Sequence, residues 1–148
     1  MDYQLLAEQV LSVTNNVKNN ITNFANASAL LFNTLPDINW AGFYTANGDV
    51  LELGPFQGKV ACTLIPKGKG VCGTAFALGK TIVVPNVHEF KGHIACDSDS
   101  NSEIVIPVIV NGTIIAVLDI DSTKFDRFSE DDITGLELFV KSLANSLV

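Results

Sequence analysis

The sequence predicts an α+β fold in which helices pack on an antiparallel sheet. Apolar residues recur with helical spacing at both ends of the chain and with strand-like spacing between them. The strand segments come mainly as adjacent pairs joined by tight turns, which favours antiparallel pairing over the crossovers of a parallel sheet. The chain has 148 residues, 47% of them hydrophobic and 17% charged, so we expect one domain, residues 1–148, with a buried core.

The first segment, up to Pro36, is predicted to be helical. Apolar residues between Leu5 and Val17 recur at near-helical spacing. Apolar residues return at positions 29–32, after the pattern has weakened at Asn19, Asn20, Asn23 and Asn26. The segment therefore fits either two helices or one bent helix.

Strand patterns begin at Ile38. A turn at Asn47-Gly48-Asp49 separates NWAGFYT from VLELGPF, which predicts a hairpin, and a third strand is predicted over KVACTLI, residues 59–65. The loop at residues 66–70 lacks the glycine pattern of a phosphate-binding loop, so we expect a turn. A short helix is predicted over VCGTAFALGK, ended by Gly79.

The C-terminal half continues with TIVVP, a predicted strand, and a loop from Asn86 to about Ser102. The clearest hairpin is EIVIPVIVNGTIIAVLDIDS, with Asn111-Gly112 as its turn. A capping-box-like pair, Ser129 and Asp132, begins the last helix, whose apolar residues are Ile133, Leu136, Phe139, Val140 and Leu143.

Charge and composition disfavour several classes of partner. The net charge of −7 argues against nucleic acid or an anionic membrane. No segment has the length and apolarity of a membrane span, and the N-terminus lacks the basic and apolar regions of a signal peptide. Three cysteines fit a reducing cytosol, where thiols are free, catalytic or metal-bound. We therefore expect a cytoplasmic protein.

The loop from Gly92 to Pro107, GHIACDSDSNSEIVIP, is the strongest functional candidate. It places Cys96 in a polar segment together with Asp97, Asp99 and Glu103. A buried structural cysteine would normally lie within an apolar run, whereas this one lies where polar groups can act on a thiol. The segment offers a nucleophile with several proton donors or acceptors; the alternative is a surface thiol without a role.

The other cysteines are Cys62, on a predicted strand, and Cys72, near the start of the short helix, where the helix dipole can stabilise a thiolate. Both could equally be small core residues. No pair has CxxC or zinc-finger spacing. His88 and His93 flank the Cys96 loop and could join the cysteines around a metal. Because no compact ligand spacing is present, we expect no metal site.

Carboxylates also interrupt the apolar run AVLDIDS. Asp119 and Asp121 alternate by two, so on a strand they point to the same face. They are either solvated at the end of the strand or directed into a pocket, where they could bind an amine or, when protonated, donate to a polarised oxygen. Trp40, with Tyr44 on the same face, is either a core residue or one wall of such a pocket.

These segments resemble the free methionine-(R)-sulfoxide reductases, which are single GAF domains. The resemblance rests on NWAGFY, PKGKGVCGTAF, GHIACDSDSNSEIVIP and AVLDIDS with FDRFSEDD, and it covers the chain from about Asp37 onward. It departs at Lys91, where the family often has proline. The fold that it implies is a GAF-like antiparallel sheet with the N- and C-terminal helices on one face. A short helix and an active-site loop lie on the other.

The resemblance also implies a mechanism. Cys96 would attack the sulfoxide sulfur and become a sulfenic acid, and Cys62 would resolve it as a disulfide that thioredoxin reduces. Cys72 would be an auxiliary thiol. The acids of the pocket would be Glu103 and Asp121 at the sulfoxide oxygen and Asp119 at the oxygen or the ammonium group. The aromatic wall around the substrate's methyl group would be formed by Trp40 and its neighbour Tyr44.

The resemblance further implies free methionine sulfoxide as substrate, no cofactor, and a homodimer. The preference for the R epimer rests on the resemblance alone. Two other functions remain open from the residues: a GAF sensory module that binds a small ligand without converting it, and a redox or zinc-binding protein that uses the cysteines and histidines.

Overall fold

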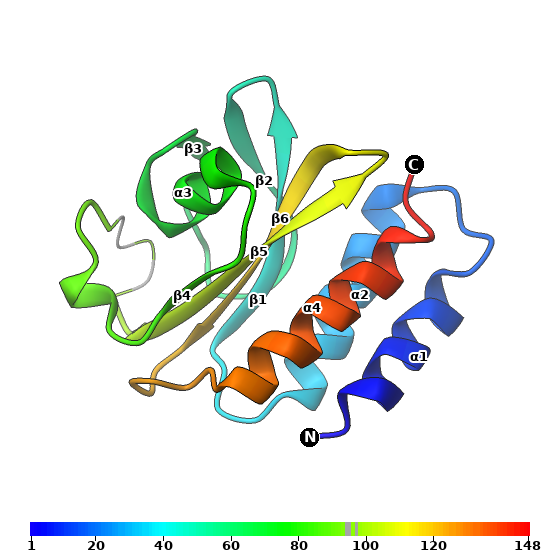
Figure 1. Ribbon diagram of the computed structural model, residues 1–148, viewed down its shortest axis with the longest axis horizontal. Coiled ribbons are helices and arrows are strands. Elements are labelled where there is room, and N and C mark those ends of the chain that lie inside the picture. Colours follow the sequence, from blue (N-terminus) through cyan, green and yellow to red (C-terminus); the bar gives the residue numbers. More distant parts are fainter. Residues whose placement is uncertain (94–95, 97) are drawn as a thin grey trace.

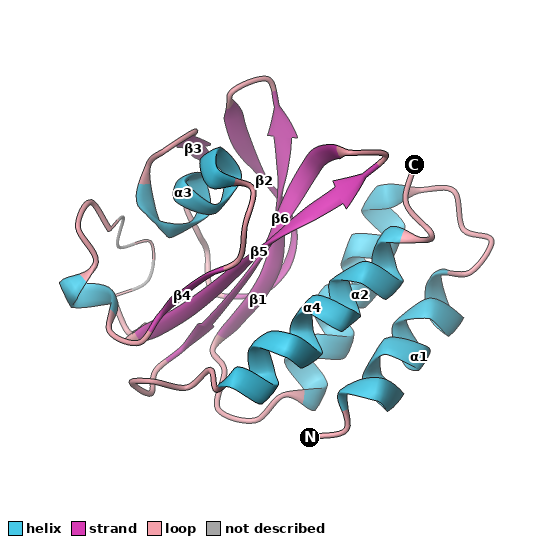
Figure 2. Cartoon of the chain, in the orientation of Figure 1, coloured by secondary structure: helices cyan, strands magenta, loops and turns pink. Residues whose placement is uncertain are grey.

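The computed structural model describes residues 1–93, 96 and 98–148. Four α-helices, one 3₁₀ turn and six strands make up the described part of the chain (Figures 1 and 2). The helices are α1 (Tyr3–Thr14), α2 (Asn20–Thr34), α3 (Gly70–Leu78) and α4 (Glu130–Ala144), and the 3₁₀ turn is η1 (Val87–Glu89). The strands are β1 (Trp40–Asn47), β2 (Val50–Gly58), β3 (Leu64–Pro66), β4 (Ile82–Val84), β5 (Ser102–Val110) and β6 (Thr113–Ser122).

The six strands form one sheet in the order β3-β2-β1-β6-β5-β4, and every neighbouring pair is antiparallel. Helices α1, α2 and α4 lie together on one side of this sheet, and α3 lies on the other (Figures 1 and 2). The predicted α+β class, with terminal helices on one face and the short helix on the other, is confirmed. No helix within the described residues is long and apolar enough to cross a membrane.

Alternation along the central strands produces a core on each face of the sheet. On the helical side, Phe43, Ile104 and Leu118 pack with α1, α2 and α4 in the larger core. On the other side, Val105 and Val117 pack with α3 in a smaller one. The strands in the middle of the sheet are therefore apolar on both faces, so a polar residue on them needs a specific reason.

The N-terminal segment forms two helices rather than one bent helix. Asn16 adopts a left-handed backbone with φ of 64°, which stops α1. Asn19 then caps α2, because its side chain accepts hydrogen bonds from the backbone N–H groups of Ile21 and Thr22. Asn19 therefore lies at the boundary between the helices, whereas Asn20, Asn23 and Asn26 lie within α2.

Both predicted hairpins are present, and their turns follow the expected chemistry. Asn111 and Gly112 have φ values of 52° and 77°, the conformation of the tight turn that suits right-handed strand twist. The capping box is also confirmed, since the side chains of Ser129 and Asp132 each accept from the other's backbone N–H.

The third strand is shorter than predicted. It covers Leu64–Pro66, and Cys62 lies in the loop before it instead of on a strand. The side chains after β2 face water, with Val60 89% exposed, so the apolar letters of this segment do not mark a buried face. Side chains of β1 hold the loop: the Trp40 Nε1 donates to the carbonyl of Lys59 at 3.0 Å, and the Tyr44 hydroxyl donates to the carbonyl of Cys62 at 3.1 Å.

The two ends of the chain meet where α1 packs on α4. The Tyr3 hydroxyl donates to Asp132 Oδ1 at 2.5 Å, and Arg127 Nη1 lies 3.0 Å from Asp132 Oδ2. Burial by itself would raise the pKa of Asp132, but these contacts together with the hydrogen bonds from Ser129 lower it. The Tyr3 ring rests directly on Gly135, where a Cβ would overlap it.

We expect Gly135→Ala to destabilise the protein by about 1–3 kcal/mol, because the added methyl group collides with the Tyr3 ring. Alanine would otherwise stabilise a helix by about 1 kcal/mol relative to glycine. In a Tyr3→Gly background the collision is gone, because the Tyr3 Cβ, 2.6 Å from the position of the added methyl group, is removed together with the ring, so the same substitution should become neutral or stabilising. Urea unfolding of the four proteins measures this cycle, and equal effects in both backgrounds would contradict it.

Candidate active site

The register of three central strands brings the predicted carboxyl groups together. Glu103 on β5 lies opposite Asp121 on β6, and Asp121 lies opposite Trp40 on β1. Asp119 is two residues back along β6, opposite Gly42 of β1. Cross-strand partners lie side by side on one face, so all of these groups face α3. The prediction that Asp119 and Asp121 point to the same face fits this arrangement.

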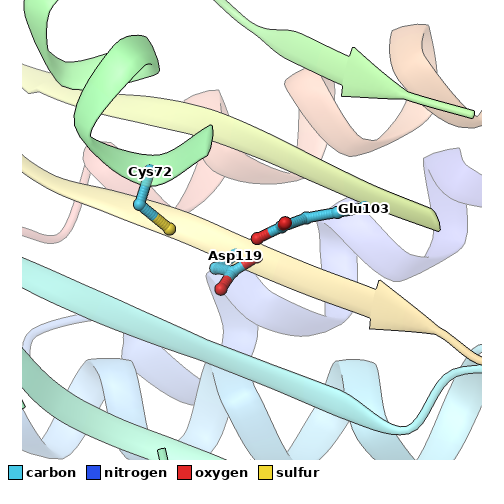
Figure 3. Close-up of side chains that lie close together, drawn as sticks. All are labelled: Cys72, Glu103 and Asp119. Atoms are coloured by element: carbon cyan, nitrogen blue, oxygen red, sulfur yellow. The ribbon is translucent and has the colours of Figure 1, made fainter. Parts of the chain in front are cut away.

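Cys72, in the first turn of α3, lies over the carboxyl groups (Figure 3). Its Sγ and one carboxyl oxygen each of Glu103 and Asp119 all lie within 4.8 Å of one another. The three side chains are buried, at 4%, 7% and 5% exposure respectively. Asp119 Oδ1 is buried and meets no hydrogen-bond partner among the described residues.

Burial and mutual repulsion raise the pKa values of all three groups. The pKa of Glu103 is raised well above its usual range by burial and then by the charge of Asp121. That of Asp119 is raised by burial and then by the charge of Glu103. The pKa of the Cys72 thiol is raised by burial and then by the charge of Asp119. Neutral carboxyl groups at neutral pH can donate a proton to a bound oxygen.

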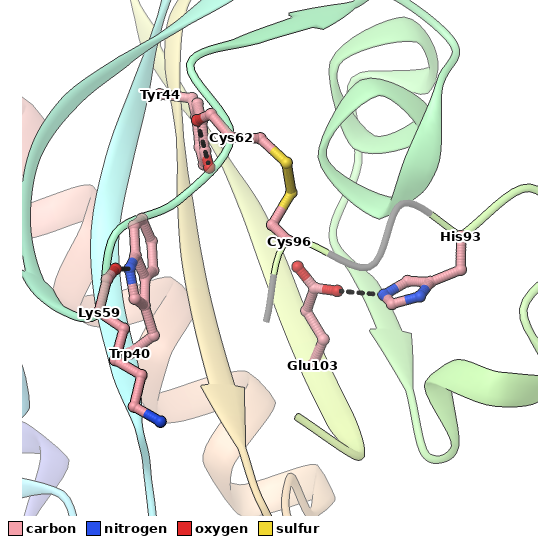
Figure 4. Close-up of a disulfide and its surroundings, with 7 residues drawn as sticks. All are labelled: Trp40, Tyr44, Lys59, Cys62, His93, Cys96 and Glu103. Atoms are coloured by element: carbon pink, nitrogen blue, oxygen red, sulfur yellow. Dashed lines mark hydrogen bonds and ion pairs between the residues drawn. A yellow bond between two sulfur atoms is a disulfide. The ribbon is translucent and has the colours of Figure 1, made fainter. Parts of the chain in front are cut away.

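The other two cysteines form a disulfide beside this cluster (Figure 4). Cys62, in the loop after β2, and Cys96, in the loop before β5, are bonded with their Cα atoms 5.4 Å apart. Tyr44 connects the disulfide to the sheet through the hydrogen bond from its hydroxyl to the Cys62 carbonyl. The sequence places Tyr44 near the pocket but gives no sign of this bond, because it joins a strand to a loop 18 residues away.

A cavity of about 30 Å³, room for about two water molecules, lies between the cluster and the disulfide. Six of the eight residues singled out from the sequence line it: Tyr44, Cys72, Cys96, Glu103, Asp119 and Asp121. Lys69, His93 and Ser100 line it as well. The candidate residues from four separate segments therefore converge on one small cavity.

Trp40 and Cys62 lie beside this cavity rather than in its lining, so six of the eight candidate residues line it in this disulfide form. The Trp40 side chain is 2% exposed and stacks between the rings of Tyr44 and Phe56, with centroid separations of 5.9 and 5.1 Å. Its ring passes close to Gly42, where a Cβ would lie 2.8 Å from Trp40 Cη2. Glycine is therefore required there for the indole to lie flat on the sheet.

Reasoning from the sequence did not assign a role to His93, which the structure places at the edge of the site (Figure 4). Its Nε2 lies 3.7 Å from Glu103 Oε1, and burial lowers the pKa of His93. Its position three residues before Cys96 was the available signal. His88, by contrast, contacts Asn101 Oδ1 at 2.8 Å on the surface. The two histidines and three cysteines do not assemble into one cluster in the described part of the chain.

Other polar residues of the Cys96 loop lie outside the carboxyl cluster. Asp99 is exposed and forms an ion pair with Lys59 at 2.9 Å, which joins this loop to the one that carries Cys62. Ser100 is buried, and its hydroxyl accepts a hydrogen bond from Asn39 at 3.1 Å. Asp97 lies outside the described residues. The acidity of the loop therefore serves partly to attach it to the neighbouring loop.

Comparison with known proteins identifies the family. The GAF domain family matches residues 11–147. The free methionine-R-sulfoxide reductase of Escherichia coli is 56% identical over 127 residues, which cover 86% of this chain and 77% of that protein. The chain belongs to the free methionine-R-sulfoxide reductase family.

Solved structures agree with the assignment. The reduced form of the Staphylococcus aureus fRMsr superposes with a TM-score of 0.96 at 49% identity and covers 99% of this chain and 96% of that one. The free methionine-R-sulfoxide reductase from Neisseria meningitidis, in complex with its substrate, has a TM-score of 0.93 at 42% identity, with 97% and 87% covered. This member of the family is an oxidoreductase, and its Cys62–Cys96 disulfide fits thiol chemistry.

The buried acids predict that this family member loses stability as the pH rises. An acid with a raised pKa keeps its proton in the folded state and releases it in the unfolded state, so stability falls above the unfolded pKa of about 4. Asp119→Asn removes one such group. We expect the free energy of unfolding of Asp119→Asn, relative to that of the wild type, to increase with pH by at most about 1.4 kcal/mol per pH unit.

Urea unfolding at pH 5, 6, 7 and 8 measures this difference. The matched control is Asp49→Asn, because the Asp49 side chain is 88% exposed in the β1–β2 turn. Parallel curves of stability against pH for the wild type and Asp119→Asn would show that Asp119 is ionised in the folded protein.

Proposed function

We propose that this protein reduces free methionine-(R)-sulfoxide to methionine, with Cys96 as nucleophile, Cys62 as resolving thiol and thioredoxin as reductant. The observation that carries the proposal is the position of the Cys62–Cys96 disulfide over a buried cluster of carboxyl groups with raised pKa values. Sulfoxide reduction requires a thiol and a proton donor beside the same small cavity. The proteins most similar in sequence include reductases named for this substrate.

In the first step, the Cys96 thiolate attacks the sulfoxide sulfur while a carboxyl group protonates the sulfoxide oxygen. Oxygen passes to Cys96, which becomes a sulfenic acid, and methionine leaves with its sulfur reduced by two electrons. Glu103 and Asp121 are the acids assigned to the oxygen, since they face each other across β5 and β6. The proton donated by the carboxyl group stays on the sulfenic acid, and the carboxylate takes up the proton that the Cys96 thiol released when the thiolate formed, so the step is balanced.

In the second step, Cys62 attacks the sulfur of the Cys96 sulfenic acid, the S–S bond forms, and the oxygen leaves as water. Thioredoxin then reduces the disulfide by thiol–disulfide exchange and is itself oxidised. Cys72 is an auxiliary thiol in this scheme: it lines the same cavity as Cys96 and stays reduced while the other two cysteines are bonded.

Substrate recognition is assigned to the groups around the cavity. Asp119 takes the sulfoxide oxygen or the ammonium group of the amino acid, because a carboxyl group can serve either ligand according to its protonation. Trp40 and Tyr44, stacked 5.9 Å apart, form the aromatic wall that takes the methyl group. A site this small favours a free amino acid over the same residue within a peptide, since it leaves little room for a chain.

The protein is further proposed to act as a cytoplasmic homodimer. Three cysteines with a redox-active pair suit a compartment in which thioredoxin keeps thiols reduced. Apolar side chains on the outer surface of α1, with exposures of 39% to 49%, offer a contact surface for a second copy: Leu5, Leu11 and Val13.

We expect Cys96→Ser to consume neither epimer of free methionine sulfoxide. Reduced wild type and Cys62→Ser, freed of reductant, should each release about one methionine per protein, because the attack needs only Cys96. With the thioredoxin system, Cys62→Ser should turn over at least about tenfold more slowly than the wild type, because the resolving thiol is missing. Full turnover by Cys96→Ser would refute the assignment of the nucleophile, and a wild type that consumes neither epimer would favour a ligand-binding sensor.

The closed cavity predicts that loop movement accompanies reduction. About 30 Å³ is far below the several hundred Å³ of a typical small-molecule site, so the loops that carry Cys62 and Cys96 must separate before substrate enters. Reduction should speed amide hydrogen exchange in residues 59–63 and 98–100 by at least about tenfold, with α4 as the internal control. Identical exchange in both redox forms would contradict the movement.

A further inference from the structure

The cluster of Cys72, Glu103 and Asp119 has the composition of a metal site. One donor atom from each side chain lies within 4.8 Å of the other two, and the three come from α3, β5 and β6 (Figure 3). All three side chains are more than nine-tenths buried. They line one cavity, so a bound ion would be held by three different elements of the fold.

One buried carboxyl oxygen of this cluster's side chains lacks a hydrogen-bond partner among the described residues. Asp119 Oδ1 is buried and finds no hydrogen-bond partner among the described residues. A buried oxygen of this kind usually has a donor, a water molecule or a cation beside it, because leaving it unpaired costs free energy. Its neighbours Cys72 and Glu103 supply a hydrogen only when protonated, whereas a cation would satisfy all three groups in their ionised forms.

We propose that Cys72 Sγ, a Glu103 carboxyl oxygen and Asp119 Oδ1 form a Zn²⁺ site that, when occupied, inhibits the enzyme. Zinc accepts a mixed thiolate and carboxylate set in tetrahedral geometry, whereas magnesium and calcium take oxygen ligands in larger numbers. A water molecule in the adjoining cavity of about 30 Å³ completes the coordination.

The geometry requires a small contraction of the cluster. Bonds of about 2.0–2.3 Å in a tetrahedron place the ligand atoms about 3.3–3.8 Å apart, so the widest separation has to close by about 1 Å. Side-chain rotation alone can supply a movement of this size. The thiolate and two carboxylates carry three negative charges against the two positive charges of the ion, which replaces mutual repulsion with attraction.

Zinc binds the deprotonated forms of thiol and carboxyl ligands and releases their protons, so binding should strengthen as the pH rises. The other titratable groups that face the same cavity are Tyr44 from β1, Asp121 from β6, and Lys69 and His93 from the loops. Inhibition follows because the ion occupies the carboxyl oxygens assigned to the substrate. The inhibitory part therefore rests on the proposed function, whereas zinc binding does not.

The oxidised protein offers a direct test of binding. With Cys62 and Cys96 bonded, Cys72 is the single free thiol of the three cysteines. Zn²⁺ affinity is measured by competition with a chromophoric chelator, and Co²⁺ is used as a spectroscopic probe. We expect a near-ultraviolet thiolate-to-cobalt charge-transfer band in the wild type and its loss in Cys72→Ser. Cys72→Ser and Asp119→Asn should each bind Zn²⁺ at least tenfold more weakly, whereas Asp49→Asn should bind like the wild type.

A missing cobalt band, or equal Zn²⁺ affinity in the wild type and both ligand variants, would overturn the site. Circular dichroism on each variant separates loss of a ligand from loss of the fold. Inhibition is tested on reduced protein freed of reductant, because dithiols chelate zinc: Zn²⁺ should block release of methionine in a single turnover, and EDTA should restore it. Turnover that continues with Zn²⁺ saturating would overturn the inhibitory part. Absence of turnover without Zn²⁺ would instead refute the proposed function and leave the binding result standing.

Discussion

The pairing of β5 with β6, and of β6 with β1, determines where every other group in the site can be. Glu103, Asp121 and Trp40 lie in one row across these strands. A slip of one residue in the register would turn the carboxyl groups toward α1, α2 and α4, where the larger apolar core could not accept them. The large core fixes the register of the strands, and the register fixes the positions of the acids. Helix α3 then places Cys72 over them.

Holding these acids beneath α3 is unfavourable for stability and useful for chemistry. Burial raises the pKa values of Glu103 and Asp119, because the folded state lacks the hydration that both carboxylates have in the unfolded chain. The same burial makes them proton donors at neutral pH. The helical side of the sheet offsets the cost, since its contacts include the Tyr3–Asp132–Arg127 cluster that joins the two ends of the chain.

Much of this fold could be predicted from the sequence, because hairpin turns and helix caps are local signals. Asn111-Gly112 and the Ser129 capping box each specify their structure within a few residues. The shared face of Asp119 and Asp121 on β6 was also predictable locally, since the two residues are separated by two positions on one strand. Contacts between distant segments were not predictable. The local spacing of residues indicates neither that Cys72 lies close to Glu103 nor that His93 contacts Glu103. Family resemblance, and not pattern, supplied the pairing of Cys62 with Cys96.

The position of Cys62 in a loop, and not on the predicted strand, bears on the mechanism. A Cys62 within a strand would be fixed by ladder hydrogen bonds, and moving it would break several of them at once. In the loop it is held by the Tyr44 hydroxyl bond to its carbonyl and by the neighbouring contact between Trp40 and Lys59. The facing loop is attached through exposed contacts such as the Lys59–Asp99 pair, which is worth little in water. If both loops move relative to the sheet, as the proposed mechanism requires, the two cysteines can approach and separate while the carboxyl cluster stays in place.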